Sequence, residues 1–175
     1  MVVDALEDLA SAWSSLDGSA TWSRGTDCDS MAAVYCDDDG HVVALEVRNG
    51  NISASIPESI TALEELSWLY IKSSELTGSL PPALFTLPNL VHVLLDANQL
   101  SGTLPSSLGS LSALVNLILS TNGFSGSIPN SLSKLTSLEY LVLQYNGFTG
   151  QIPDSLGNVT NLEALYPRLK HWQGD

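Results

Sequence analysis

Residues 117–140 read LILSTNGFSGSIPNSLSKLTSLEY, and the pattern of this stretch returns every 24 residues along most of the chain. A fixed period of this length predicts a solenoid, in which each coil buries its apolar side only against neighbouring coils. The sequence therefore predicts one elongated domain whose function lies on surfaces that successive coils share. The positions that carry the period are Leu45, Leu69, Val93, Leu117, Leu141 and Leu165, together with Pro57, Pro81, Pro105, Pro129 and Pro153.

Each coil is predicted to begin with a short strand. The alternation at 117–119 sends Leu117 and Leu119 into the core and Ile118 outward, because successive side chains of a strand point to opposite faces. An asparagine follows this strand in three coils, and its inward amide is expected to bond to the turning backbones of adjacent coils. The first two coils carry Gly50 and Ser74 at this position and should be less regular. The asparagines are Asn98, Asn122 and Asn146.

A second segment of the coil has the pattern S-G-x-I-P or a close variant of it. It combines a turn, a further extended stretch and a proline that fixes the backbone before a helical turn. The leucines that follow recur at helical spacing and are predicted to belong to the core, as at Leu108, Leu111 and Leu114.

The charge of the chain restricts the class of partner. There are 19 acidic residues against 6 basic ones, and 14 of the acidic residues precede residue 76. Nucleic acid requires a basic footprint, and an anionic membrane surface repels such a chain, so neither is predicted as a partner. The sequence contains no apolar run long enough to span a membrane, so no direct membrane insertion is predicted either.

Cys28 and Cys36 are the two cysteines, and they lie just before the first coil, where the apolar end of a solenoid must be covered. A disulfide here would place the protein in an oxidising compartment, and two free thiols are the alternative. Residues 1–27 lack the pattern of a signal peptide, so either a leader has been removed or the protein is intracellular.

The repeat resembles the plant-specific subclass of leucine-rich repeats, whose hallmark is the L-S-G-x-I-P element. That element reads LSGTLP at 100–105, FSGSIP at 124–129 and FTGQIP at 148–153. The resemblance implies an α/β solenoid: a right-handed superhelix with a parallel β-sheet on its concave face and an N-terminal capping helix. It also implies an extracellular or cell-surface location and a role in recognition rather than catalysis, as in plant receptor-like ectodomains.

The same resemblance divides the chain into three parts. Residues 1–44 resemble an N-terminal cap with a disulfide, residues 45–164 form five repeats, and residues 165–175 form a partial sixth repeat or C-terminal tail, which Pro167 interrupts. The cap is expected to hold an amphipathic helix and then a first strand through Val42 and Leu45. The apolar side of that helix, with the aromatic residue after it, comprises Leu6, Leu9, Trp13, Leu16 and Trp22.

Outward strand positions of successive coils are predicted to form columns on the exposed sheet, and most members of the central column are apolar or aromatic. A stripe of this kind predicts a binding surface for a peptide or protein ligand. Strand propensity alone is the plain alternative, and burial of the stripe in a homodimer is another. The predicted binding residues are Trp68, Tyr70, His92, Leu94, Ile118, Tyr140, Val142 and Tyr145.

The S-G-x-I-P segments suggest a second surface. If coils stack roughly 4.7 to 4.9 Å apart, their hydroxyls form two parallel rows on a flat strip, which could bind ice. Such residues are also typical of the repeat subclass whatever its function. A further alternative is an inhibitor of a secreted enzyme such as polygalacturonase. The predicted ice-binding residues are Ser53, Ser55, Thr77, Ser79, Ser101, Thr103, Ser125, Ser127 and Thr149.

No catalytic residue, cofactor or metal ligand is predicted. His41, His92 and His171 are far apart in the sequence, and no nucleophile motif accompanies them. The acidic run Asp37–Asp39 lacks the alternating ligand spacing of a calcium loop and is predicted to be a solvated turn.

Two sequons, at Asn51 and Asn158, are predicted glycosylation sites if the chain passes through a secretory pathway. A glycan at Asn51 would lie beside the hydroxyl strip and hinder a flat contact with ice.

Overall fold

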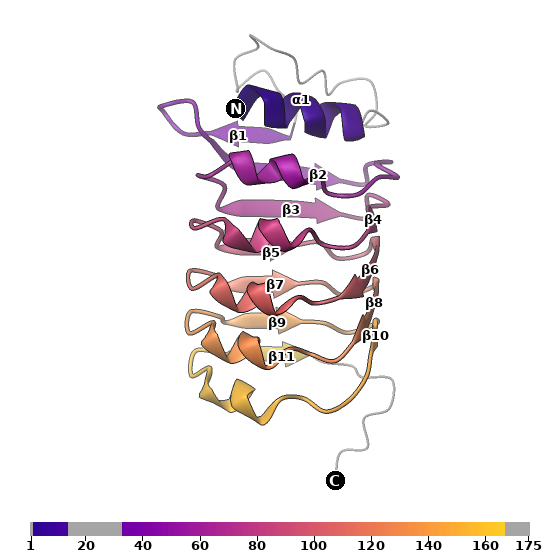
Figure 1. Cartoon of the computed structure of the whole chain (residues 1–175), viewed down its shortest axis with the longest axis vertical. Helices are drawn as coiled ribbons and strands as arrows, with labels where there is room; N and C mark the ends of the chain where they lie inside the picture. Colours follow the sequence, from indigo (N-terminus) through magenta and orange to yellow (C-terminus); the bar gives the residue numbers. More distant parts are fainter. Residues whose placement is uncertain (1, 14–32, 167–175) are drawn as a thin grey trace.

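The coils stack one below another in the computed structural model, which describes residues 2–13 and 33–166 (Figure 1). Neighbouring strands of the larger, seven-stranded sheet pair in parallel, except that β1 and β2 are antiparallel. Its strands, in spatial order, are β1 (Val34–Cys36), β2 (Val42–Arg48), β3 (Trp68–Lys72), β5 (His92–Leu94), β7 (Asn116–Ile118), β9 (Tyr140–Val142) and β11 (Ala164–Tyr166).

The larger sheet keeps the 24-residue period without slippage. Leu69 of β3 lies opposite Val93 of β5, and Leu117 of β7 lies opposite Leu141 of β9. Equivalent side chains therefore share one column from coil to coil, which confirms the predicted parallel solenoid. The exposed side of this sheet is called the strand face below.

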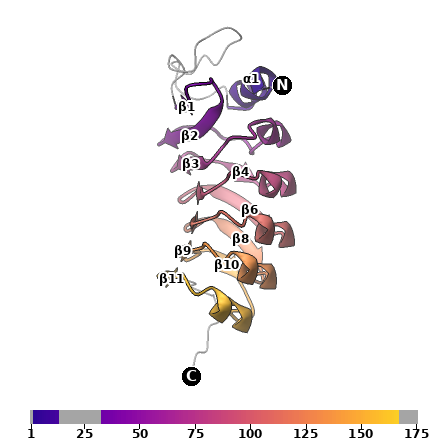
Figure 2. The ribbon, with the colours of Figure 1, turned by 90° about the vertical axis from the view of Figure 1, so that its left-hand side faces the viewer.

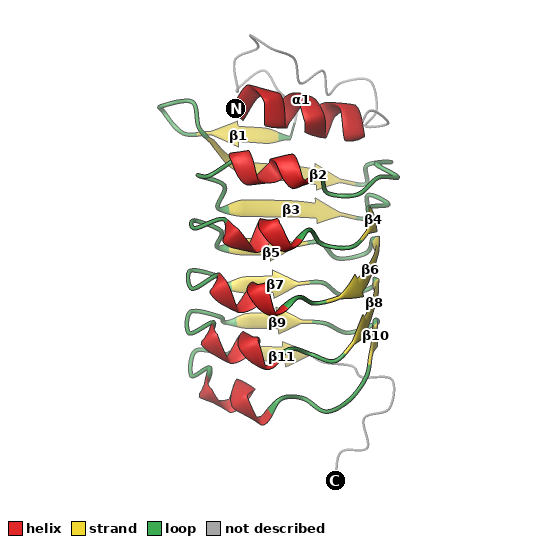
Figure 3. Cartoon of the chain, viewed as in Figure 1, coloured by secondary structure: helices red, strands yellow, loops and turns green. Residues whose placement is uncertain are grey.

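Short 3₁₀ helices occupy the side of the coils away from the larger sheet (Figures 2 and 3). Each follows a proline, which fixes the backbone as the turn begins, and the prolines before the first four of these helices are extended. The leucines predicted for the core, such as Leu108 and Leu114, are fully buried between these helices and the sheet. The helices are Glu58–Ala62, Pro82–Thr86, Ser106–Ser110, Asn130–Lys134 and Asp154–Asn158.

A smaller sheet lies between the strand side and the 3₁₀ helix side of the coils. Its register differs from that of the larger sheet. Its strands are β4 (Thr77–Gly78), β6 (Gln99–Thr103), β8 (Gly123–Gly126) and β10 (Gly147–Phe148). Thr103 lies opposite Ser125, which is 22 residues further along the chain instead of 24. Equivalent residues are therefore displaced by two positions along the strand, which is about 7 Å.

The N-terminal helix α1 (Val2–Ala12) packs on the first 3₁₀ helix and covers that end of the core. Leu6, Leu9 and Trp13 are buried as predicted, and the Trp13 indole donates a hydrogen bond to the Ser55 carbonyl at 3.1 Å. Leu16, Trp22 and Cys28 lie outside the described residues, so the Cys28–Cys36 disulfide stays a prediction.

The asparagine ladder has the predicted role. Asn122 donates to the carbonyls of Leu95, Leu119 and Ser120 at 2.9 to 3.3 Å, and its side-chain oxygen accepts the Leu100 N–H at 3.0 Å. Two of these four partners belong to the preceding coil. Each asparagine therefore satisfies polar backbone groups that no strand pairs.

The first coils are less regular, as predicted. Ser74 replaces the asparagine, and its hydroxyl donates to the Lys72 carbonyl at 2.7 Å and accepts the Gly50 N–H at 3.1 Å. Residues 53–55 of the first coil form no strand of the smaller sheet.

One column of residues adopts left-handed backbone geometry that the sequence did not reveal. The residue before the asparagine position has a φ between 50° and 58° in each coil where the structure describes it, although none of these residues is glycine. This conformation is uncommon and costly for most L-residues, and asparagine tolerates it best. The column comprises Asn49, Ser73, Ala97, Thr121 and Tyr145.

Replacing Thr121 by Asn is expected to raise the free energy of unfolding by about 0.5 to 1 kcal/mol, because a β-branched residue is poorly suited to this geometry. Urea unfolding measures the change. Thr136→Asn is the matched control, since Thr136 is also exposed but does not have a positive φ. Equal changes in both variants would contradict the explanation from backbone strain.

Candidate functional site

The strand face brings the predicted binding residues into two columns. The central column contains Tyr70, Leu94, Ile118 and Val142 in register, and the flanking column contains Trp68, His92, Asn116 and Tyr140. Trp68 and Tyr140 are exposed, whereas the four central residues are half-buried. Both columns continue beyond the predicted residues, because Tyr166 extends the central column and Tyr35 lies opposite Ala44 in the flanking column.

The aromatic residues of the flanking column contact each other. The rings of Trp68 and His92 have centroids 4.1 Å apart and are tilted by 50°. Burial lowers the pKa of His92, and the nearby charge of Glu139 opposes that shift only in part. His92 is therefore neutral at physiological pH and acts as an aromatic surface rather than as a charge.

The two basic residues of the strand face are neutralised within the chain. The Arg48 guanidinium lies 4.8 Å from the centre of the Tyr70 ring and forms an ion pair with Glu46 at 2.5 Å. Lys72 pairs with Asp96 at 2.9 Å, and this hydrogen bond raises the pKa of Lys72. Asp96 is thus engaged by lysine and does not serve His92 as a catalytic partner.

Two glutamates beside Tyr140 belong to this surface and were missed by the sequence reasoning. The Tyr140 hydroxyl donates to the Glu163 carboxylate at 2.6 Å, and this bond raises the pKa of Tyr140. Glu139 acts electrostatically on both Tyr140 and His92. Both glutamates occupy the position just before a strand, 24 residues apart, and this spacing was the signal available in the sequence.

Tyr145 lies in the left-handed column, at the edge of the strand face. Its side chain is 57% exposed and its φ is 58°. A bulky residue in this conformation is uncommon, and Tyr145 shares the conformation with the equivalent residues of the preceding coils.

The hydroxyl residues of the S-G-x-I-P segments are largely exposed, but equivalent hydroxyls of successive coils do not face each other, and Thr103 instead lies opposite Ser125. Ser101 lies opposite Gly123 in the ladder, and Ser125 lies opposite Gly147. The expectation of equivalent hydroxyls one strand spacing apart is therefore wrong, because the smaller sheet is offset by two residues. The exposed members are Ser53, Ser55, Ser79, Ser101, Thr103, Ser125, Ser127 and Thr149, and Thr77 is half-buried.

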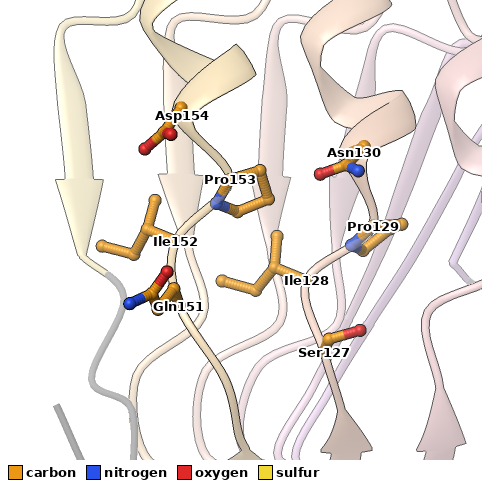
Figure 4. Close-up of a pocket in the computed structure, with 8 residues that line it drawn as sticks. All are labelled: Ser127, Ile128, Pro129, Asn130, Gln151, Ile152, Pro153 and Asp154. Atoms are coloured by element: carbon orange, nitrogen blue, oxygen red, sulfur yellow. The ribbon is translucent and has the colours of Figure 1, made fainter.

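The strip is also not flat near its C-terminal end. A hollow of about 300 Å³ separates the segment 127–130 from the segment 151–154 (Figure 4). Gln151 and Asp154 line one side of it, and Ser127 and Asn130 line the other.

The acidic turn at Asp37 is closed by its own hydrogen bonds. The Asp37 carboxylate accepts the backbone N–H groups of Asp39 and His41 at 3.0 and 2.8 Å, and it lies 3.1 Å from the His41 ring. These bonds lower the pKa of Asp37, and the side-chain bond raises the pKa of His41. The turn is exposed, which agrees with a solvated loop.

The sequon asparagines Asn51 and Asn158 are both exposed, and His171 lies outside the described residues. No helix in the described ranges has the length and apolar character needed to cross a membrane.

The leucine-rich repeat family model matches residues 89–111, 113–135 and 137–159. A comparison with curated proteins finds no match to this chain.

Solved plant structures share the fold over most of the chain. The leucine-rich repeat ectodomain of the membrane receptor kinase GASSHO1/SCHENGEN3 from Arabidopsis thaliana, in complex with CASPARIAN STRIP INTEGRITY FACTOR 2, is 29% identical with a TM-score of 0.89. The alignment covers 97% of this chain and 21% of that one. A plant ice-binding protein is 30% identical with a TM-score of 0.83, over 90% of this chain and 52% of that one.

The BIR3–SERK2 complex from Arabidopsis thaliana is 27% identical with a TM-score of 0.75, and the alignment covers 98% of this chain and 95% of that one. The chain thus spans about a fifth of the receptor-kinase ectodomain and about half of the ice-binding protein.

Proposed function

Since this chain is a leucine-rich repeat protein of the plant type, we propose that it is an extracellular recognition module that binds a peptide or protein ligand on the strand face. The proposed contact residues are those predicted from the sequence, extended by Tyr35 and Tyr166. The role is non-enzymatic, and the chain needs no cofactor for it.

The observation that carries this proposal is the register of the larger sheet. Because its strands pair without offset, Tyr70, Leu94, Ile118 and Val142 form one unbroken apolar column across four coils. Trp68 and Tyr140 stand beside this column and are exposed by 39% and 37%. Exposed aromatic residues around an apolar centre are typical of binding hot spots.

Solved neighbours add support from outside the chain. Several are receptors in complex with a ligand, including GASSHO1/SCHENGEN3 with CASPARIAN STRIP INTEGRITY FACTOR 2 and the plant peptide hormone receptor RGFR1 with RGF2. The related ectodomains are those of membrane receptors, which also supports an extracellular location. With that location we propose the Cys28–Cys36 disulfide and glycans at Asn51 and Asn158.

Selection of binders from a peptide display library on the immobilised full chain tests the proposal. The variant Tyr70→Ala with Tyr140→Ala is expected to weaken the selected binders at least tenfold, because two aromatic contacts of the strand face are lost. Dissociation constants from fluorescence anisotropy give the measurement. Ser106→Ala with Ser110→Ala is the control, since both serines are exposed on the 3₁₀ helix side.

The proposal fails if the tyrosine variant remains folded and binds every selected peptide as tightly as the unaltered chain. Equal weakening by the serine control would also contradict it.

Ice binding is the second candidate, and the likeness to a plant ice-binding protein favours it. The offset rows and the hollow of Figure 4 argue against a flat contact. An assay of ice-growth inhibition separates the two functions. It uses variants in which bulky residues replace Ser101, Thr103 and Ser125. Ice-growth inhibition that these variants lose and the tyrosine variant keeps would establish the second candidate.

A further inference from the structure

Resting on the proposed function, we infer that the C-terminal part of the strand face holds a cationic side chain of the ligand, a lysine or arginine. We define the acceptor as the carboxylates of Glu139 and Glu163 with the ring of Tyr140, and call it the cation acceptor. The ligand is thus a peptide segment that places a basic residue beside apolar residues lying along the central column.

The N-terminal part of the same face shows how it holds a guanidinium. Arg48 lies over the Tyr70 ring at 4.8 Å and against the Glu46 carboxylate. A tyrosine face and a carboxylate together suit a cation, through the ring quadrupole and the ion pair. The chain therefore supplies its own cation at this end.

At the other end, a tyrosine and carboxylates again lie together, and no ion pair joins them to a basic residue of the part of the chain that the structure describes. The Tyr140 hydroxyl donates to Glu163 at 2.6 Å, and Glu139 is close enough to act on Tyr140 as well. The basic residues of the described ranges are Arg48, Lys72 and Lys134. Arg48 and Lys72 are paired elsewhere, and Lys134 lies in a 3₁₀ helix on the other side of the coil.

The two glutamates are neighbours in space. The Glu163 N–H donates to the Glu139 carbonyl at 2.8 Å, so their backbones are adjacent and the side chains start from equivalent positions of successive coils. A cation beside both carboxylates would be attracted by each of them. The net charge of −13 would also attract a basic ligand from a distance.

The apolar column fixes where the rest of the ligand lies. Val142 and Ile118 are half-buried beside Tyr140 in the register of the larger sheet, so a ligand that reaches the cation acceptor also covers them. A free cation or a buffer amine lacks this second contact. The combination favours a peptide over a small cation.

Three synthetic heptapeptide pools test the inference on the full chain. They differ only at the central position, which is arginine, norleucine or glutamate, and the other positions are randomised among uncharged residues. We expect the immobilised chain to retain the arginine pool about tenfold more than the norleucine pool, and the glutamate pool least. The preference should decrease as salt is raised, because charged contacts at a surface are screened.

Glu139→Gln with Glu163→Gln should remove the preference for arginine, so that the arginine pool is retained no more than the norleucine pool. Glu58→Gln with Asp154→Asn is the matched control, because it removes the same net charge from the exposed starts of two 3₁₀ helices. Thermal unfolding verifies that both variants remain folded.

The outcomes separate this inference from the proposed function. If Tyr70→Ala with Tyr140→Ala weakens retention of the norleucine pool but the unaltered chain shows no arginine preference, the inference fails and the proposed function stands. The inference also fails if the control variant lowers the preference as much as the glutamine variant does. If the unaltered chain retains no pool, or the tyrosine variant retains every pool unchanged, both fail.

Discussion

Replacing Asn146 by Ala is expected to lower the free energy of unfolding by about 3 to 5 kcal/mol. The Asn146 side chain is buried, donates to the carbonyls of Leu119 and Leu143 at 2.9 Å each, and accepts the Phe124 N–H at 3.1 Å. Alanine would leave the Leu143 carbonyl and the Phe124 N–H without these bonds, and the Leu119 carbonyl would keep only its bond from Asn122 at 3.2 Å. Each unsatisfied backbone group costs about 1 to 3 kcal/mol, which sets the size of the effect.

Urea unfolding followed by circular dichroism measures this loss. The control is Asn161→Ala, which removes one exposed hydrogen bond to the Thr136 carbonyl at 2.8 Å and should cost less than about 1 kcal/mol. A loss at Asn146 no greater than that at Asn161 would show that the ladder does not stabilise the coils.

Replacing Gly109 by Ala is expected to cost about 2 to 3 kcal/mol, although alanine normally stabilises a helical turn relative to glycine. A β-carbon at Gly109 would lie 2.4 Å from the Ser131 carbonyl oxygen of the next coil. A backbone carbonyl cannot move aside by changing rotamer, as a side chain can. The two coils would therefore have to move apart locally. The close approach of coils therefore requires glycine at this position.

Gly157→Ala is the matched control, because Gly157 occupies the same position in the last 3₁₀ helix and a β-carbon there would meet nothing within 4 Å. That substitution should be neutral or should stabilise the protein by up to about 1 kcal/mol. The difference between the two variants in chemical unfolding is the quantity of interest. Two equal changes would contradict the packing explanation.

The sequence predicted most of the fold because the repeat constrains what a coil can bury. The period and the chemistry of each residue type predict three features. These are the inward leucines, the prolines before helical turns and the hydrogen bonds of Asn122. The offset of the smaller sheet could not be predicted in this way. A period counts residues per coil, but it does not determine how a strand lies relative to the equivalent strand of the next coil.

The candidate site was predicted in part for the same reason. Tyr70 and Tyr140 lie where the columns placed them. Tyr35 was missed because it joins the strand face through an antiparallel pair, which lies outside the repeat. Glu163 was missed because the alternation of a strand does not indicate that a residue just before it reaches the tyrosine of the neighbouring coil.

The asparagine ladder gives the solenoid a direction. Asn122 satisfies the Leu95 carbonyl and the Leu100 N–H of the coil before it, and Asn146 does the same for Leu119 and Phe124. Each coil thus depends on its successor for the partner of one backbone N–H, and the successor also supplies a second bond to a carbonyl that the coil's own asparagine contacts. Loss of the last coil would therefore remove hydrogen bonds from the coil before it. Unfolding is expected to proceed from the last repeat towards the first.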